Sequence, residues 1–319
     1  MKLKTSIAFF AIAGLSLLLI TGGCRHRRTQ SSAASSGRGA EAGKAEVNIA
    51  PSDATPDPKA VEAKLESNDS EGVDFPEKEE IRRSYNLSPG ALVNIYGING
   101  RVKIETAGAK TAEVLIIRSA KKREDLEFRR VNIEHEPRNL TIRVENDRKS
   151  IFSALGSIPE GRQRVILRLP KEVDLETSGV NGNFSAGEIR GRMELRGISG
   201  EVKVARVTGN TEVSGVNGGI DITFAPLVGK KVEMNGVNGN IDLRFEGDVN
   251  ADVNTWGVNG NVEADLPNVD RTDAEPRRGR IKARIGTGGT KIEAHGVNGN
   301  INLMKAAKSD TTTAKAAGK

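Results

Sequence analysis

The sequence predicts an all-β fold, a single-stranded, right-handed β-solenoid with coils of 18–21 residues. Apolar and polar residues alternate after each copy of a repeated tetrapeptide, as in half-buried strands. Aromatic residues make up only 3% of the chain while glycine occurs 36 times, which favours a thin aliphatic core under frequent turns. The tetrapeptide is Gly, an aliphatic residue, Asn or Ser, and Gly, and its seven copies begin at Gly97, Gly179, Gly197, Gly215, Gly236, Gly257 and Gly296.

Within one unit the alternation changes phase at the first glycine of the tetrapeptide. Val232 and Met234 precede Gly236 in one phase, and Val237 and Ile241 follow it in the other. Because only glycine enters φ > 0 cheaply, this position predicts a corner between two strands. The following Asn-Gly is also turn chemistry, since Asn tolerates the left-handed region better than most residues.

Two architectures fit such a unit. In a solenoid the tetrapeptide valines stack from coil to coil, and the equivalent asparagines form an amide ladder. In a meander each unit is a hairpin with Asn-Gly at its tip, and stacking of the asparagines is not required. The faithful repetition favours the solenoid. The expected ladder members are Asn181, Asn217, Asn238, Asn259 and Asn298.

The repeats are less regular toward both ends. Residues 82–170 hold strands of uneven spacing, which we expect to form N-terminal coils or a β cap. The last tetrapeptide follows its predecessor by 39 residues, about two periods, with an insertion around 267–280 and a degenerate unit near 284–289. The β-strand-repeat domain is predicted to span residues 81–305.

Residues 1–24 have the features of a lipoprotein signal peptide. Two lysines precede an uncharged run of 14 residues from Ile7 to Ile20, shorter than the ~20 residues that cross a bilayer. Cys24 is the only cysteine and follows Thr-Gly-Gly, a setting similar to the bacterial lipobox, in which the thiol takes a diacylglycerol. Cys24 is therefore the predicted lipidation site, and it would attach the chain to a membrane of the bacterial cell envelope. An uncleaved anchor or an ordinary signal peptide is the alternative.

Composition sets the remaining boundaries. Residues 25–80 are rich in Ser, Ala, Gly, Pro, Glu and Lys and predict a disordered tether, because they hold too little apolar surface to offset their ordering entropy. Residues 306–319 predict a disordered tail. The net charge of +6 is spread among interleaved acidic and basic residues, which favours solubility over nucleic-acid binding.

With these residues in hand, the chain resembles the bacterial putative-adhesin family of β-strand-repeat proteins, a domain family of unknown function. The resemblance is carried by the strand 92–100, the strand 165–170 and the Gly-Val-Asn-Gly-Asn units. It implies an export or membrane-anchoring segment and a right-handed β-helix, and it supplies no catalytic residues. The family's repeats more often carry Ser-Gly-Asp where this chain has Asn-Gly-Asn.

The residues suggest no enzyme, cofactor or metal site. Asp221, Asp242 and Glu263 would occupy one outward position in successive coils, where paired carboxylates could divide acid and base roles or bind Ca²⁺. Each lies in an ordinary polar strand position, so a solvated face is the favoured interpretation. His135 would point away from the face that Glu134 and Glu136 share. The basic runs at 121–130 and 277–284 are expected to be solvated or to contact an anionic lipid or polysaccharide.

We therefore expect a non-enzymatic, envelope-anchored β-solenoid lipoprotein that acts as an adhesin-like binding or structural scaffold. Its flat repeated faces suit an extended protein or glycan partner, with the membrane engaged through the N-terminal lipid. A carbohydrate-active enzyme on the same coil and an envelope-stress sensing component are the alternatives.

Overall fold

The computed structural model describes residues 75–108, 110–146, 160–272 and 279–307. The predicted signal peptide, Cys24, most of the tether and most of the tail lie outside these ranges. Apart from one short helix, α2 (Arg123–Phe128), the regular elements of the described residues are strands, so the all-β prediction is confirmed. The first strand, β1, begins at Glu77, and the expected end of the tether at residue 80 therefore falls inside it.

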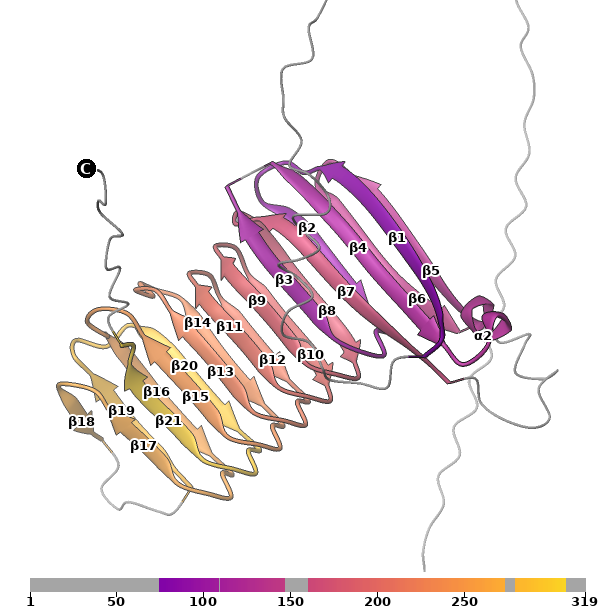
Figure 1. Cartoon of the computed structure of the whole chain (residues 1–319). Coiled ribbons are helices and arrows are strands. Elements are labelled where there is room, and N and C mark those ends of the chain that lie inside the picture. The colour runs from indigo at the N-terminus through magenta and orange to yellow at the C-terminus, as the bar shows by residue number, and fades with distance from the viewer. Residues whose placement is uncertain (1–74, 109, 147–159, 273–278, 308–319) are drawn as a thin grey trace, which may run out of the picture. The chain divides into compact units, whose positions relative to one another are not determined.

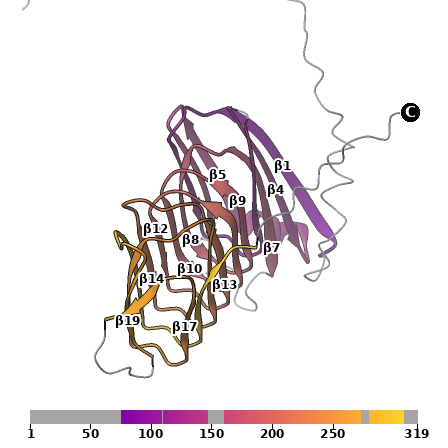
Figure 2. The same ribbon diagram turned by 90° about the vertical axis from the view of Figure 1, so that its left-hand side faces the viewer.

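The strands of the described residues form two sheets that face one another, as the end view in Figure 2 shows. The ten-stranded sheet has the order β1 (Glu77–Asn86), β4 (Thr111–Ala120), β7 (Gly161–Pro170), β3 (Val102–Ala107), β9 (Phe184–Ile189), β11 (Val202–Val207), β13 (Ile220–Phe224), β15 (Ile241–Phe245), β21 (Ile301–Lys305), β17 (Val262–Asp265). The eleven-stranded sheet has the order β18 (Val269–Arg271), β19 (Ile281–Ile285), β16 (Ala251–Trp256), β20 (Thr290–His295), β14 (Lys231–Asn235), β12 (Thr211–Ser214), β10 (Met193–Ile198), β8 (Val173–Val180), β2 (Ala91–Tyr96), β6 (Asn139–Asn146), β5 (Arg129–Glu136).

Each repeat unit contributes one strand to each sheet, and units that are neighbours in the stack pair in parallel and in register (Figure 1). Ile220 pairs with Ile241 and Phe224 with Phe245, so like residues stack on like. The two phenylalanine rings stack with centroids 5.5 Å apart. Strands joined as hairpins would be antiparallel, so the parallel pairing rules out the meander.

Chain order and spatial order differ at both ends of the stack. β2 and β3 lie between the unit of β6 and β7 and the unit of β8 and β9, and β20 and β21 lie between the unit of β14 and β15 and the unit of β16 and β17 (Figure 1). Of the predicted N-terminal cap, only the antiparallel pairs made by β1, β4 and β5 close the stack; β2 and β3 belong to its parallel interior.

The predicted degenerate unit near residues 284–289 is wrong. β19 pairs antiparallel with β16 and with β18, so this segment closes the second end of the stack instead of adding a parallel coil. Its alternation of buried Ile281, Ala283 and Ile285 looks like a repeat strand because alternation reports burial and carries no information on strand direction.

The core between the sheets consists of the alternating aliphatic residues and the tetrapeptide aliphatics. Val216, Val237 and Val297 are each 1% exposed, and this inward column was predicted. The leading glycines turn the chain with positive φ, as predicted: 71° at Gly97 and 60° at Gly236, with the other five copies in between. The second glycine is needed for packing, since a Cβ on Gly239 would lie 2.2 Å from the Gly218 carbonyl oxygen.

The asparagine ladder is confirmed for four of its five expected members, in spatial instead of chain order. Asn238 Nδ2 donates to Asn217 Oδ1 at 3.0 Å, Asn298 donates to Asn238 at 3.0 Å, and Asn259 donates to Asn298 at 3.1 Å. Asn181 donates to Asn99 in the same way at 2.9 Å. The expectation that these asparagines adopt left-handed backbone is wrong: Asn268 is the only described non-glycine residue with positive φ.

Candidate binding surface

The predicted carboxylate column lies on the outer face of the ten-stranded sheet, but it is interrupted. Asp221 pairs in register with Asp242, and the next position holds Asn302, which separates Asp242 from Glu263. The expectation of three carboxylates in successive positions is therefore wrong, because β21 enters between β15 and β17. Arg244 forms an ion pair with Asp221 and lies 3.9 Å from Asp242, to which Asn302 also donates a hydrogen bond of 2.7 Å.

His135 is held by neighbouring residues of the first strands. Its ring stacks on Tyr85 with centroids 4.7 Å apart, and Nε2 lies 3.0 Å from the Asn86 carbonyl oxygen. Across the described residues, no group of three His, Cys, Asp or Glu side chains is arranged to hold a metal ion. Part of the second basic run, residues 277–278, lies outside the described ranges.

A row of glutamates crosses the outer face of the eleven-stranded sheet. The register places one glutamate on each of five neighbouring strands, from β8 to β20. Neighbouring strands lie ~4.8 Å apart, and like charges directly opposite one another are destabilising. The row therefore needs compensating cations. Its members, called the glutamate row below, are Glu176, Glu194, Glu212, Glu233 and Glu293.

Three basic side chains each bridge two neighbours in the glutamate row. Arg192 pairs with Glu194 and lies 3.9 Å from Glu176. Arg196 pairs with Glu194 and lies 3.4 Å from Glu212. Lys231 lies 2.7 Å from Glu233 and 3.1 Å from Glu293, and these two hydrogen bonds raise the pKa of Lys231. Each of the five glutamates thus has at least one cation within 4 Å, and the three cations offset part of the negative charge of the row.

A second interstrand network joins units near the strand ends. Glu188, on β9, accepts hydrogen bonds from Lys171 at 2.8 Å and from Arg190 and Arg206 at 2.9 Å each. The Lys171 and Arg190 bonds lower the pKa of Glu188 to about 2. Arg206 also donates to Glu246, 2.9 Å away, so the network links four segments of the stack.

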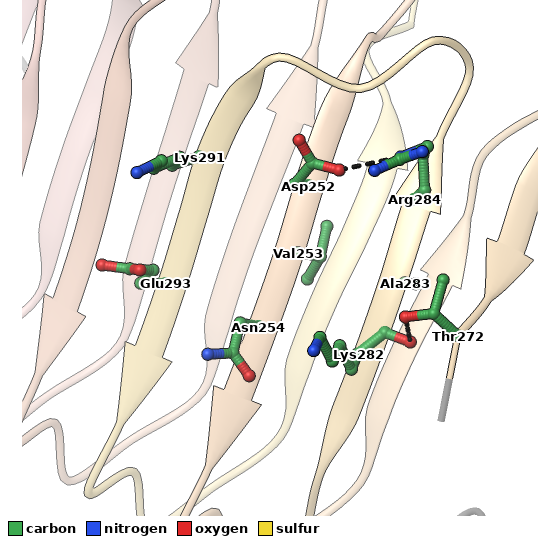
Figure 3. A pocket seen from close by; sticks show the side chains of 9 residues that line it. All are labelled: Asp252, Val253, Asn254, Thr272, Lys282, Ala283, Arg284, Lys291 and Glu293. Carbon is green, nitrogen blue, oxygen red and sulfur yellow. Dashed lines mark hydrogen bonds and ion pairs between the residues drawn. The ribbon is translucent and has the colours of Figure 1, made fainter. Parts of the chain in front are cut away.

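The glutamate row ends at β20, one strand before the sheet becomes antiparallel. In register beyond Glu293 comes Asn254 on β16, and beyond Asn254 comes Lys282 on β19. The shorter, neutral Asn254 leaves a shallow groove of about 360 Å³ between these strands (Figure 3). Within the groove, Arg284 and the backbone N–H of Gly289 each donate to Asp252 at 3.0 Å, which lowers the pKa of Asp252. The lining residues are Asp252, Val253, Asn254, Thr272, Lys282, Ala283, Arg284, Lys291 and Glu293.

Two aromatic rings occupy opposite ends of another outward row of the same sheet. Trp256 on β16 stacks on His295 with centroids 4.8 Å apart and is still 42% exposed. Tyr96 on β2 is covered by Arg143, whose guanidinium carbon lies 4.8 Å from the ring centroid. Trp256 therefore offers an aromatic surface to solvent, whereas Tyr96 is half-buried and covered by Arg143.

The glutamate row was not predicted, although the sequence carries a signal for it. Each of its glutamates stands three residues before the leading glycine of a tetrapeptide, for example Glu233 before Gly236. Asn254 stands at the same position before Gly257, so the change from glutamate to asparagine was also readable. The groove itself depends on the antiparallel return of β19, which no repeat pattern indicates.

Two facing sheets of parallel strands in register, with glycine corners between them, define an all-β repeat domain with solvent-exposed polar faces. Residues 190–304 match the family model described as Toastrack DUF4097, a domain of unknown function, so the chain contains a domain of this family. The resemblance inferred from the repeats is thereby confirmed. No helix within the described ranges is long and apolar enough to cross a membrane.

Solved structures from bacteria resemble the chain at low identity. A putative cell adhesion protein from Clostridium sporogenes is 14% identical and covers 72% of this chain and 100% of its own, with a TM-score of 0.40. A putative adhesin from Bacteroides fragilis is 12% identical and covers 72% of this chain and 99% of its own, with a TM-score of 0.36. A putative lipid binding protein from Parabacteroides distasonis is 11% identical and covers 74% of this chain and 99% of its own, with a TM-score of 0.26. No protein of curated function matches the sequence.

Proposed function

We propose that the protein is an envelope-anchored lipoprotein whose repeat domain is a non-enzymatic, adhesin-like scaffold for an extended partner. In this proposal Cys24 carries the lipid, the tether separates the domain from the membrane, and the domain is a single-stranded, right-handed β-solenoid. The outer faces of the sheets bind a partner that runs across several strands.

The observation that carries this proposal is the regular outer face of the eleven-stranded sheet. Polar side chains recur there in register, strand after strand, and their charges are paired with one another. A face of this kind can make the same contact repeatedly at ~4.8 Å intervals, which suits an extended ligand better than a small substrate. The interrupted column of Asp221, Asp242 and Glu263, already engaged by Arg244 and Asn302, gives the enzyme alternative less support.

Anchoring is tested by metabolic palmitate labelling of the wild type and of Cys24→Ala, each followed by fractionation. We expect label and membrane association only in the wild type. Wild-type protein that is unlabelled and freely soluble would refute the anchoring.

The scaffold role is tested in intact cells with a photoreactive residue at Ser178, Ser214 or Asn235, which lie in one outward row. An extended partner predicts adducts of the same partner from all three positions. A matched probe at buried Val213 should give none. Absence of adducts at all three outward positions would contradict a partner on this face.

A further inference from the structure

The outer face of the eleven-stranded sheet carries one feature that the repeats do not explain, the exposed ring of Trp256 beside the groove. Trp256 and Val228 are the exposed large apolar residues of the described chain. One face of the indole is occupied by His295, and the ring nevertheless remains 42% exposed. An indole surface of this kind is a common anchor in binding sites, because it offers a large rigid contact area with only two rotatable angles.

We propose that Trp256 and the adjoining groove bind a carboxylate-bearing sugar of an acidic polysaccharide. The proposal rests on the proposed scaffold function and names its ligand class. The electron-rich face of the indole attracts the C–H bonds on one side of a pyranose ring. Polar groups beside the indole hold the hydroxyls and the carboxylate.

The groove supplies those polar groups on neighbouring strands. Asn254 lies two residues before Trp256 on the same face of β16, and its amide is available for sugar hydroxyls. Lys282 lies opposite Asn254 on β19, diagonally from Trp256, a separation of about 7–8 Å in an antiparallel pair. The volume of about 360 Å³ falls within the range of about 300–1,000 Å³ typical of small-ligand sites.

The charges of the groove favour an anionic ligand. Three cations, Lys282, Arg284 and Lys291, line it against two carboxylates, Asp252 and Glu293. Asp252 is already paired with Arg284, as Figure 3 shows, and Glu293 is paired with Lys231. Lys282 makes no ion pair with any described residue, so its ammonium can meet a ligand carboxylate without breaking an existing contact. A cationic ligand, which an indole would also attract, is disfavoured by this balance.

A single-stranded nucleic acid fits the surface less well. Single-stranded nucleic acids stack successive bases on several aromatic rings along a basic track. Here the ring beside the groove is Trp256 with His295 on one face, and the strands toward the middle of the sheet present the glutamate row. A sugar with one carboxylate per residue, engaged at one ring, matches the site better.

Because Trp256 is the only tryptophan in the chain, its fluorescence reports directly on the site. The purified full chain would be titrated with hyaluronan, alginate, polygalacturonate and sialylated oligosaccharides, each beside its carboxyl-reduced counterpart. We expect saturable quenching or a spectral shift with at least one carboxylated sugar and at least a tenfold weaker effect with its reduced form. No response to any carboxylated sugar, or an equal response to an oligothymidylate, would overturn the proposal.

Variants locate the site by calorimetry with the responding sugar. Trp256→Ala and Lys282→Glu should each weaken binding at least tenfold. Tyr96→Ala, in the same row but covered by Arg143, and Lys203→Glu, on the other sheet, are matched controls that should bind as the wild type does. Equal binding by Trp256→Ala would also overturn the proposal. A failed titration combined with persistent adducts at Ser214 and Asn235 would reject the sugar site and leave the scaffold function standing.

Discussion

The middle of the stack and its C-terminal end are built from the same tetrapeptide unit but are assembled differently. From β8 to β15 each unit lies directly beside the next unit in the sequence, with parallel pairing. At the end, β20 and β21 enter between two units that are consecutive in sequence, and β19 returns antiparallel. The middle buries its valines at 1% exposure, while Val258 at the end is 8% exposed.

The repeat therefore determines the local geometry of each unit and leaves the stacking order of the units open. Any unit with a glycine corner, an inward valine and an outward asparagine can pair with any other such unit. The last unit fills an interior position, so the antiparallel β18 and β19 form the outermost strands of their sheet. Both strands at the exposed edges here, β17 and β18, are short, which limits edge-to-edge association.

The largest expected effect comes from ending the chain after residue 289, which removes β20 and β21. β14 and β16 would each lose a parallel partner and stand two strand spacings apart, ~9–10 Å instead of ~4.8 Å. We expect residues 246–285 to become protease-sensitive while the units before residue 245 remain protected, as measured by limited proteolysis with mass spectrometry. A chain ending after residue 307 is the control. Equal protection in both chains would mean that the interposed unit is dispensable.

Substitutions in the inward valine column should destabilise the middle of the stack more than its end, with a smaller effect than the truncation. Val237→Asp places a carboxylate among aliphatic side chains at a position 1% exposed, and we expect a loss of more than about 4 kcal/mol in the free energy of unfolding. Val258→Asp should cost less, because that position is nearer to solvent. Urea denaturation followed by circular dichroism measures both. A larger loss at Val258 would reverse the comparison.

The lowered pKa of Glu188 should make the stability of the middle of the stack depend on pH. Its pKa of about 2 in the folded chain lies below the value of ~4.3 for an unperturbed glutamate. A depressed carboxyl pKa stabilises the fold above the unfolded value, and this contribution is lost as the pH falls from ~4.3 toward 2. The whole contribution is at most about 3 kcal/mol. Glu188→Gln should therefore flatten the fall in stability between pH 5 and pH 2, measured by urea denaturation at each pH.

The matched comparison at the end of the stack is Asp252→Asn. Asp252 also has a lowered pKa, but its carboxylate is exposed and paired with the exposed Arg284. Exposed ion pairs contribute little, so this variant should change the acid profile less than Glu188→Gln does. Identical profiles for Glu188→Gln and the wild type would show that the network around Glu188 does not stabilise the fold.

The sequence could predict the unit but not the order of the units. Alternation and glycine phase slips identified the strands, the corner at Gly236 and the inward position of Val237, because these follow from side-chain geometry within about ten residues. The position of β21 between β15 and β17 follows from pairing over 60 residues, and identical units give no local signal for it. The groove at Trp256 was missed for the same reason, since Lys282 reaches Asn254 only through the antiparallel return.

The last comparison concerns the asparagine ladder, which continues across the change in stacking order. Asn238 makes two ladder hydrogen bonds, one to Asn217 and one from Asn298, both at 3.0 Å. Asn259, at the end of the ladder, makes one, at 3.1 Å to Asn298. Because these amides are exposed, we expect Asn238→Ala to lower the free energy of unfolding by ~1–2 kcal/mol and Asn259→Ala by about half as much. Ser199 already interrupts the column between Asn181 and Asn217 without disturbing the parallel pairing of β10 and β12. A loss at Asn238 as large as that of Val237→Asp would therefore mean that the ladder, and not the aliphatic column, holds the units together.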